Sequence, residues 1–373
     1  MPTKDVETSV MEACRNILGI ITHGDRSHVL RKGDTVLLLG DHRDLSPLYT
    51  ESLAEIIRDW QKSGGGKVIV KYLPNERPIT SASKIDPSVT KAAVEADVVI
   101  GTYSNPGEAI RNAESSALNM AVFRIVFDRM QKGTIRLYAV AGRPNIRVLE
   151  TLADANAIEE TNKLSQQLMH YLQGKSEQKM QVYTLSEGKH GDPLEFTIPS
   201  SELVTADYFE AVESIINIPS GEVFFEPTPG TAKGKLYLKQ GSFYHLSVPV
   251  KGMIIMEFDN GEITDCRDLG RKDDEIHRFI ISHMETKENR HLAEMGIGTY
   301  VAGSNLPMED MIYNGTILEK LQGFHVAYGS SIHVKGKHEA PEHIDNWFRY
   351  GDVYIGDDHV IQRGRVNTRI LPD

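Results

Sequence analysis

The sequence predicts an α/β N-terminal domain with a mainly parallel sheet, followed by a β-rich α+β C-terminal domain. Three observations carry this prediction. In the first half of the chain, short continuous apolar runs alternate with segments of helical apolar spacing. In the second half, short strand-like segments follow one another with small turns between them. At 373 residues, the chain is long enough for two domains that each bury a core of their own.

The N-terminal half alternates between strand and helix. Residues 35–40 form a continuous apolar run after the turn at Gly33 and Asp34, as expected for a strand buried on both faces of a parallel sheet. Repetition of strand, helix and strand implies right-handed crossovers, and therefore a doubly wound sheet. The predicted strands are 35–40, 67–72, 96–101 and 134–140, and the predicted helices are 6–21, 47–61, 87–95, 117–131 and 145–174.

The polar segment 175–190 marks the predicted domain boundary. We therefore assign residues 1–175 to the doubly wound α/β domain and residues 176–373 to the β-rich domain, which carries the candidate metal site. Asn260 and Gly261 lie between two short strands and are a strong signal for a hairpin. The predicted strands of this half are 235–238, 242–250, 252–258, 262–266, 352–356 and 360–366, and one helix is predicted at 272–285.

Composition and charge exclude several classes of protein. The net charge of −11 argues against a dedicated nucleic-acid binder. The two cysteines cannot build a disulfide framework, and no CxxC pair offers a thiolate metal site. No run approaches the roughly 18 apolar residues of a membrane span, so we expect no membrane partner. The first residues show no apolar signal core, and we expect a cytoplasmic protein.

Some segments resemble two known motifs but lack the spacing that these motifs require. The glycine-rich segments at Gly64 and Gly230 lack the spacing of a phosphate loop, and we interpret them as turns. His338 and His343 resemble a zinc-protease helix, but they are five positions apart instead of four. Pro341 between them also prevents a regular helix. Neither nucleotide binding nor a helical zinc motif is therefore expected.

Ten of the fourteen histidines lie from position 190 onward, and some of them share their surroundings with isolated acidic residues. Each candidate is an ionisable group placed among apolar or glycine neighbours, where an unpaired charge costs several kcal/mol. The alternative is that the glutamates pair with lysine or arginine and that the aspartate only orients its neighbouring histidine. Glu294 precedes residues 295–299, which we interpret as a turn with almost no side-chain bulk. The candidate metal ligands are Glu222, Glu294, His325, His343 and Asp345.

Four segments that contain these residues resemble the metal-ligand motifs of the aminopeptidase T/aminopeptidase S family, in the same order along the chain. Segments 33–41 and 95–101 also resemble the α/β domain of that family, so the resemblance covers most of the chain. It implies a two-metal exopeptidase that removes N-terminal residues from peptides and forms homodimers. The four segments are 217–238, 291–299, 319–329 and 343–345.

The resemblance assigns all five candidate residues as ligands of two divalent ions, which would be zinc, cobalt, manganese or magnesium. Five protein ligands are also too many for one catalytic zinc, which usually takes three. Two ions could bind and activate a water and polarise a peptide carbonyl. We expect Glu222 to act in catalysis as well as in metal binding. The family carries a tyrosine where this chain has Ile332, and Tyr328 is the nearest phenol that could take its catalytic role.

Two alternatives remain open. The loop between His325 and His343 is shorter than in the aminopeptidases, and in this it resembles a related group, the 2,5-dihydroxypyridine dioxygenases. These enzymes keep one ferrous iron, with a histidine where this chain has Glu294, and without ligands at the positions of Glu222 and His325. The corresponding triad here would be His291, His343 and Asp345. The second alternative is a metal-free binding or scaffold protein.

Overall fold

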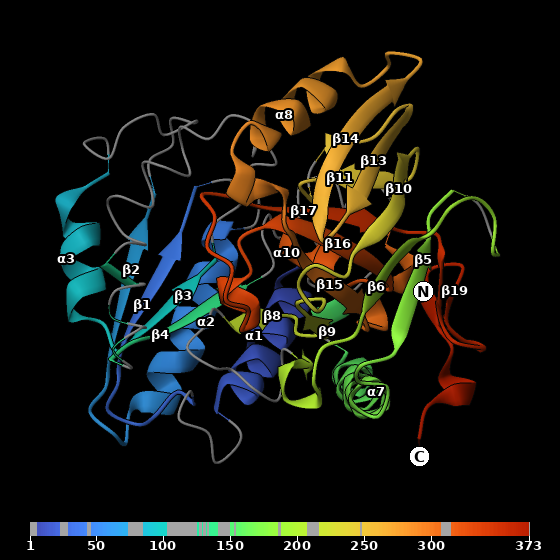
Figure 1. The fold of residues 1–373 in the computed structure, drawn as a ribbon. Helices are drawn as coiled ribbons and strands as arrows, with labels where there is room; N and C mark the ends of the chain where they lie inside the picture. Colours follow the sequence, from blue (N-terminus) through green and yellow to red (C-terminus); the bar gives the residue numbers. More distant parts are fainter. Residues whose placement is uncertain are drawn as a thin grey trace. The chain divides into compact units, whose positions relative to one another are not determined.

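The fold is described from a computed structural model of the chain (Figure 1). The chain divides into two compact units, each of which is described by itself. The first comprises Met1–Glu159, Ala211–Ser220 and Asn305–Ile317, and the second comprises the rest of the chain. The structure describes residues 6–22, 29–42, 46–73, 85–102, 125–126, 129, 132, 134–140, 150–152, 154–185, 188–206, 216–246, 248–306 and 315–372.

The first unit is built on a five-stranded parallel sheet in the order β2-β1-β3-β4-β8. Its first three strands coincide closely with the predicted runs, and the fold class is confirmed. The predicted helix 117–131 and the start of the predicted helix 145–174 lie largely outside the described residues. The strands are β1 (Thr35–Gly40), β2 (Lys67–Tyr72), β3 (Val98–Gly101), β4 (Arg136–Val140) and β8 (Ile216–Ile218).

Helices cover both faces of this sheet. Because side chains alternate along a strand, Val36 and Leu38 of β1 pack with α1 (Val6–Thr22) and α2 (Ser46–Gln61). Leu37 and Leu39 face the other way and pack with α3 (Pro87–Glu95), which Figure 1 shows on the opposite side of the sheet. Burial on both faces explains why this strand is continuously apolar.

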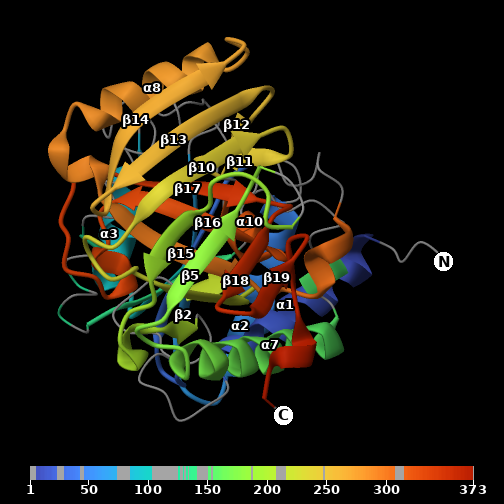
Figure 2. The same ribbon diagram turned by 45° about the vertical axis from the view of Figure 1, so that its right-hand side comes forward.

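The second unit contains two antiparallel sheets. One has eight strands in the order β14-β13-β10-β6-β5-β18-β19-β20. Figure 2 shows its yellow part, where β10, β13 and β14 lie side by side and α8 (Asp274–Met284) lies along β14. These strands are β5 (Lys179–Tyr183), β6 (Leu194–Thr197), β10 (Lys233–Lys239), β13 (Met253–Asp259), β14 (Glu262–Leu269), β18 (Asp352–Ile355), β19 (Asp358–Gln362) and β20 (Arg365–Val366).

The predicted hairpin joins β13 to β14 in this sheet. Asn260 and Gly261 both adopt positive φ, 50° and 84°, as a tight turn between antiparallel strands requires. The polar segment 175–190 at the predicted domain boundary follows α7 (Ala155–Gln173) and contains β5. Within the described part of the chain, no helix has both the length and the apolar character that a membrane span requires.

The other sheet has seven strands in the order β12-β11-β17-β16-β15-β9-β7, and it carries the candidate site. The continuous strand predicted at 242–250 is divided here, because the chain turns back between β11 and β12 through His245 and Leu246, both at positive φ. The strands are β7 (Thr205–Ala206), β9 (Glu222–Phe225), β11 (Ser242–Tyr244), β12 (Val248–Pro249), β15 (Leu292–Gly298), β16 (Gly323–Gly329) and β17 (His343–Phe348).

Candidate metal centre

The register of four neighbouring strands brings the five predicted ligands onto one face of the seven-stranded sheet. Glu294 on β15 pairs with Ala327 on β16, which in turn pairs with Asp345 on β17. Directly paired residues point to the same face, as do residues two positions apart. His325 and His343 lie two positions from Ala327 and Asp345 and therefore share this face. Glu222 on β9 joins them because it pairs with Gly298, four positions beyond Glu294.

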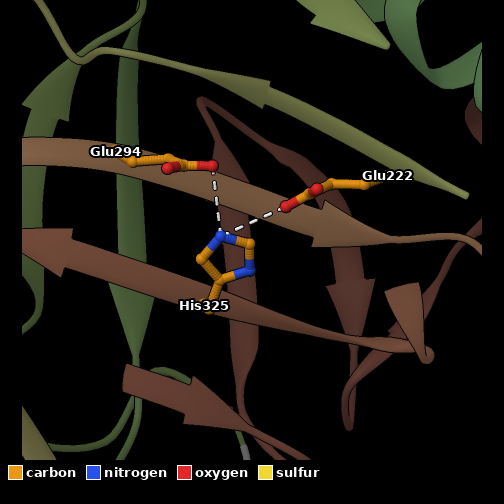
Figure 3. Close-up of side chains that lie close together, drawn as sticks. All are labelled: Glu222, Glu294 and His325. Carbon is orange, nitrogen blue, oxygen red and sulfur yellow. Dashed lines mark hydrogen bonds and ion pairs between the residues drawn. The ribbon is translucent and has the colours of Figure 1, made fainter. Parts of the chain in front are cut away.

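The functional atoms of these side chains lie within reach of one shared ion or two. Nε2 of His325 lies 3.1 Å from Oε1 of Glu222 and 3.2 Å from Oε1 of Glu294, as Figure 3 shows. Nε2 of His343 lies 3.0 Å from Oδ1 of Asp345 and 3.2 Å from Oε2 of Glu294. Two groups with metal-ligand spacing result, one of Glu222, Glu294 and His325 and one of Glu294, His343 and Asp345.

Glu294 belongs to both groups and turns one oxygen to each. Its Oε1 faces His325 and its Oε2 faces His343. All five side chains are buried except that of His343, which is partly exposed. Oxygen and imidazole donors without sulfur suit zinc, manganese, cobalt, magnesium or ferrous iron. The residues therefore fit a divalent cation, and the structure holds a buried group of histidine, glutamate and aspartate side chains that could bind one.

The ring of His343 is oriented as a metal ligand requires. Its Nδ1 lies 2.7 Å from the carbonyl oxygen of Ser330, which can only accept a hydrogen bond, so Nδ1 carries the proton. Nε2 faces the carboxylate oxygens of Asp345 and Glu294, where an ion would take the place of the Nε2 proton. A histidine ligand almost always donates its other ring N–H in this way. The Ser330 carbonyl was not predicted from the sequence, because a backbone acceptor leaves no signal in residue type.

Glu222 also pairs with a lysine, as one alternative from the sequence allowed. The ammonium group of Lys320 contacts Oε2 of Glu222 and lies 3.1 Å from Oε2 of Glu319. Lys320 ends the short helix α10 (Gly315–Lys320) and is 1% exposed. Neither Lys320 nor Glu319 was a candidate in the sequence, although both stand in the segment that contains His325. The lysine brings a buried positive charge to the edge of the candidate centre.

Charges inside the cluster shift the pKa values of its members. Burial lowers the pKa of His325, but the carboxylates of Glu222, Glu294 and Asp345 outweigh it and raise the pKa to about 10. The pKa of His343 is likewise raised, because Asp345 and Glu294 overcome the effect of burial. Burial raises the pKa of Asp345, but the two imidazoles dominate and lower it to about 2. Opposite charges on the imidazoles and the carboxylates thus attract one another, and a bound ion would replace imidazolium protons.

Two glycines of β15 leave the space that the cluster occupies. A β-carbon at Gly296 would overlap the imidazole of His325 and Oε1 of Glu222. A β-carbon at Gly298 would overlap the carbonyl group of Leu321. The sequence interpretation of residues 295–299 as a turn was wrong, because these glycines lie in and at the end of a fully buried strand. Their spacing of two was the available signal, since it places both glycines on the face of Glu294.

The phenol proposed for catalysis lies elsewhere. Tyr328 is buried, and its hydroxyl lies 3.1 Å from that of Tyr244. It is three positions from His325 on the same strand, so its side chain points to the opposite face. Ile332, at the position of the family tyrosine, is 48% exposed on the following loop. Among the described residues, no hydrogen bond or ion pair links either side chain to the cluster.

His291, a member of the alternative triad, has another partner. Its Nε2 lies 2.8 Å from Oε1 of Glu226, and its ring packs on that of His338 with 4.2 Å between ring centroids. The described groups with metal-ligand spacing contain Glu294 together with His343 and Asp345, and His291 is not among them. The carboxylate of Glu294 therefore stands closer to these two ligands than the predicted imidazole does.

Comparison with known proteins corrects the family assignment. The chain matches no protein-family model and no curated protein sequence. A solved structure of 2,5-dihydroxypyridine dioxygenase from Pseudomonas putida KT2440 matches it with a TM-score of 0.62 and 17% identity over 97% of both chains. A glyoxylate/hydroxypyruvate reductase from Sinorhizobium meliloti matches 43% of this chain and 66% of its own at 14% identity. Its TM-score of 0.21 is too low to indicate a shared fold.

The full-length likeness shows that the fold is that of the dioxygenase structure. Membership of the aminopeptidase T/aminopeptidase S family was therefore the wrong prediction, and so were the peptidase reaction, the metalloprotease class and the hydrolase class derived from it. The error has a physical source. The motifs behind the prediction are short segments around the candidate ligands, and oxygen and nitrogen ligands of this kind serve hydrolases as well as oxygenases.

Proposed function

We propose that this protein is an iron-dependent oxygenase that acts on a small hydroxylated aromatic ring. The observation that carries the proposal is the group of Glu294, His343 and Asp345, in which the backbone carbonyl of Ser330 orients the His343 ring. The dioxygenase-like fold of the whole chain supports the same reading. The oxygenase was the alternative at the level of the sequence, and it is now the preferred function.

The three side chains offer ferrous iron one imidazole and two carboxylates. Non-haem iron oxygenases commonly use two histidines and one carboxylate on one side of the ion, which leaves positions open for substrate. In this chain Glu294 would replace one of the histidines. Bound iron would supply the redox chemistry by which molecular oxygen reacts with an aromatic substrate. The additional carboxylate would offset more of the charge of the ion than an imidazole does.

The remaining residues would position these ligands and exclude water. The Ser330 carbonyl accepts a hydrogen bond from Nδ1–H of His343 and so holds Nε2 toward Asp345. His325 contacts the Oε1 of Glu294 and leaves Oε2 toward His343. The strands that carry the ligands are almost completely buried, so the charges act in a medium of low dielectric constant.

The substrate class follows from the comparison alone. The related structure is of an enzyme described as acting on 2,5-dihydroxypyridine, and we propose a small ring with two hydroxyl groups for this chain. A dioxygenase places both atoms of O₂ in its product, so the reaction needs no external reductant. One molecule of O₂ should disappear for each molecule of substrate.

Oxygen uptake by the iron-loaded protein tests the proposal. The protein would be loaded with Fe(II) under anaerobic conditions and mixed with 2,5-dihydroxypyridine and other dihydroxylated rings in oxygenated buffer. We expect stoichiometric loss of O₂ and of the ring absorbance, which Asp345→Asn abolishes and His359→Gln preserves. His359 is a suitable control because it pairs with Asp352 in the other sheet. Iron-loaded protein that consumes no oxygen with any of these rings would refute the proposal.

A further inference from the structure

A buried lysine stands at one end of the cluster. Lys320 is 1% exposed, and its ammonium group contacts Glu222 and lies 3.1 Å from Glu319. Lysine is almost never buried to this degree unless it is paired, because removing an ammonium from water is costly. Two carboxylates supply the compensation here. The position of this cation is therefore fixed by the same acidic residues that border the candidate metal centre.

Lys320 contacts the carboxylate of Glu222, which a second metal ion would need as a ligand. Of the two groups with metal-ligand spacing, the one with Glu222 and His325 lies next to Lys320. One oxygen of Glu222 contacts the ammonium, and the other lies 3.1 Å from Nε2 of His325. An ion bound between Glu222 and His325 would also lie beside a buried positive charge, and in a medium of low dielectric constant that repulsion is strong.

His343 and His325 differ in the hydrogen bonding of their Nδ1 atoms. Nδ1 of His343 has the Ser330 carbonyl as acceptor, which is the arrangement of a metal ligand. Nδ1 of His325 is buried and has no hydrogen-bond partner among the described residues. A ligand imidazole usually donates its other ring N–H to an acceptor, and His325 has none for its Nδ1 among the described residues. His343 therefore has the supporting hydrogen bond that is usual for a metal ligand, and His325 lacks it.

We propose that Lys320 occupies the place of a second metal ion, so that the cluster binds a single divalent ion through Glu294, His343 and Asp345. Glu222 and His325 then serve as positioning residues: His325 contacts Oε1 of Glu294 and leaves Oε2 for the ion, and Glu222 contacts the His325 ring. The inference uses the metal group of the proposed function but does not depend on its oxygen chemistry. It replaces the two ions that the family resemblance implied.

Metal stoichiometry tests this proposal directly. Metal-free protein would be dialysed to equilibrium against Co²⁺, and bound cobalt would be measured per chain by elemental analysis. We expect one ion in the wild type, two in Lys320→Met, and one in the charge-preserving Lys320→Arg. The double variant Lys320→Met/Glu222→Gln should bind one ion again, because it lacks the Glu222 carboxylate that would bind the second ion. A wild type that binds two ions, or a folded Lys320→Met protein that binds one, would overturn the proposal.

A second pair of variants keeps the test informative if Lys320→Met does not fold. In the wild-type background, His325→Gln should still bind one cobalt ion per chain, whereas His343→Gln should bind none. Loss of the ion in His325→Gln, or its retention in His343→Gln, would contradict the assignment. Because cobalt binding is measured without substrate or oxygen, one ion per chain in a protein without oxygenase activity would refute the proposed function and leave this inference standing.

Discussion

Gly296 lies directly against the imidazole of His325, with which it is paired across strands β15 and β16. The ring occupies the space that a β-carbon at residue 296 would fill, and Oε1 of Glu222 borders the same space. The candidate centre thus depends on a position without a side chain as well as on the five side chains that form it. Four of our predictions concern the centre and the adjoining loop between β16 and β17, residues 330–342.

Gly296→Ala should disrupt the cluster, because its methyl group overlaps His325 and Glu222. We expect metal affinity to fall by about tenfold or more, the range seen when the supports of a metal site are removed. Isothermal titration with Co²⁺ would measure it. Gly19→Ala is the matched control, since a β-carbon there meets nothing within 4 Å and alanine favours the helix in which Gly19 lies. Equal affinity in both variants would show that the glycine is not required.

Asp345→Asn should abolish tight metal binding. The asparagine keeps the shape of the side chain but loses the negative charge that lies 3.0 Å from Nε2 of His343. We expect the affinity for Co²⁺ or Fe(II) to fall by more than about 100-fold, beyond the range of outer-shell changes. Elemental analysis of the purified protein would check this. Normal metal content in Asp345→Asn would remove this residue from the centre.

Glu226→Gln should make the stability of the protein less dependent on pH. Burial raises the pKa of Glu226, but hydrogen bonds from His291, Ser331 and the Lys337 backbone outweigh it and hold the pKa below its usual 4.5. A lowered folded-state pKa contributes stability that is present above pH 4.5 and is lost as the pH falls through the lower value. The glutamine variant should be less stable by about 1 to 3 kcal/mol at pH 7.

Urea unfolding between pH 3 and 7 would measure this difference, which should shrink below pH 4.5 as Glu226 of the wild type becomes protonated. Glu285→Gln, at an exposed carboxylate, is the matched control and should follow the wild type throughout. A constant difference between Glu226→Gln and the wild type across the whole range would mean that the ionised carboxylate is not what stabilises the loop.

Metal ions should raise the thermal stability of the protein. An ion that binds only the folded state adds about 2.7 kcal/mol of stability when its concentration is 100 times the Kd. Differential scanning calorimetry with and without a chelator should therefore show a higher transition temperature for the metal-loaded wild type. The Asp345→Asn variant should melt at one temperature under both conditions. A wild type that is indifferent to the chelator would argue against a resident ion.

Much of the fold could be predicted because burial leaves a direct pattern in the sequence. The run 35–40 is apolar at successive positions because β1 is covered on both faces, and Asn260-Gly261 marks a hairpin because its backbone needs positive φ. The glycines of 295–299 misled the interpretation. Glycine serves in turns and also where a side chain crosses a strand closely, and only the three-dimensional register tells these uses apart.

The residues of the candidate site could likewise be predicted only in part. The five candidate ligands could be chosen because an isolated charge among apolar residues needs a partner, and the structure brings all five together. Lys320 and the Ser330 carbonyl could not be chosen, since one reaches the cluster from the end of a short helix and the other belongs to the backbone. The reaction could not be read from the ligands, because oxygen and nitrogen donors of this kind serve both hydrolases and oxygenases.

The most direct test of the central claim is the ratio of O₂ consumed to 2,5-dihydroxypyridine consumed by protein that has been loaded with Fe(II) and freed of unbound metal. We expect one to one in the wild type, with no uptake in the Asp345→Asn protein. Absence of oxygen uptake by the iron-loaded wild type, or equal uptake by the Asp345→Asn protein, would contradict it.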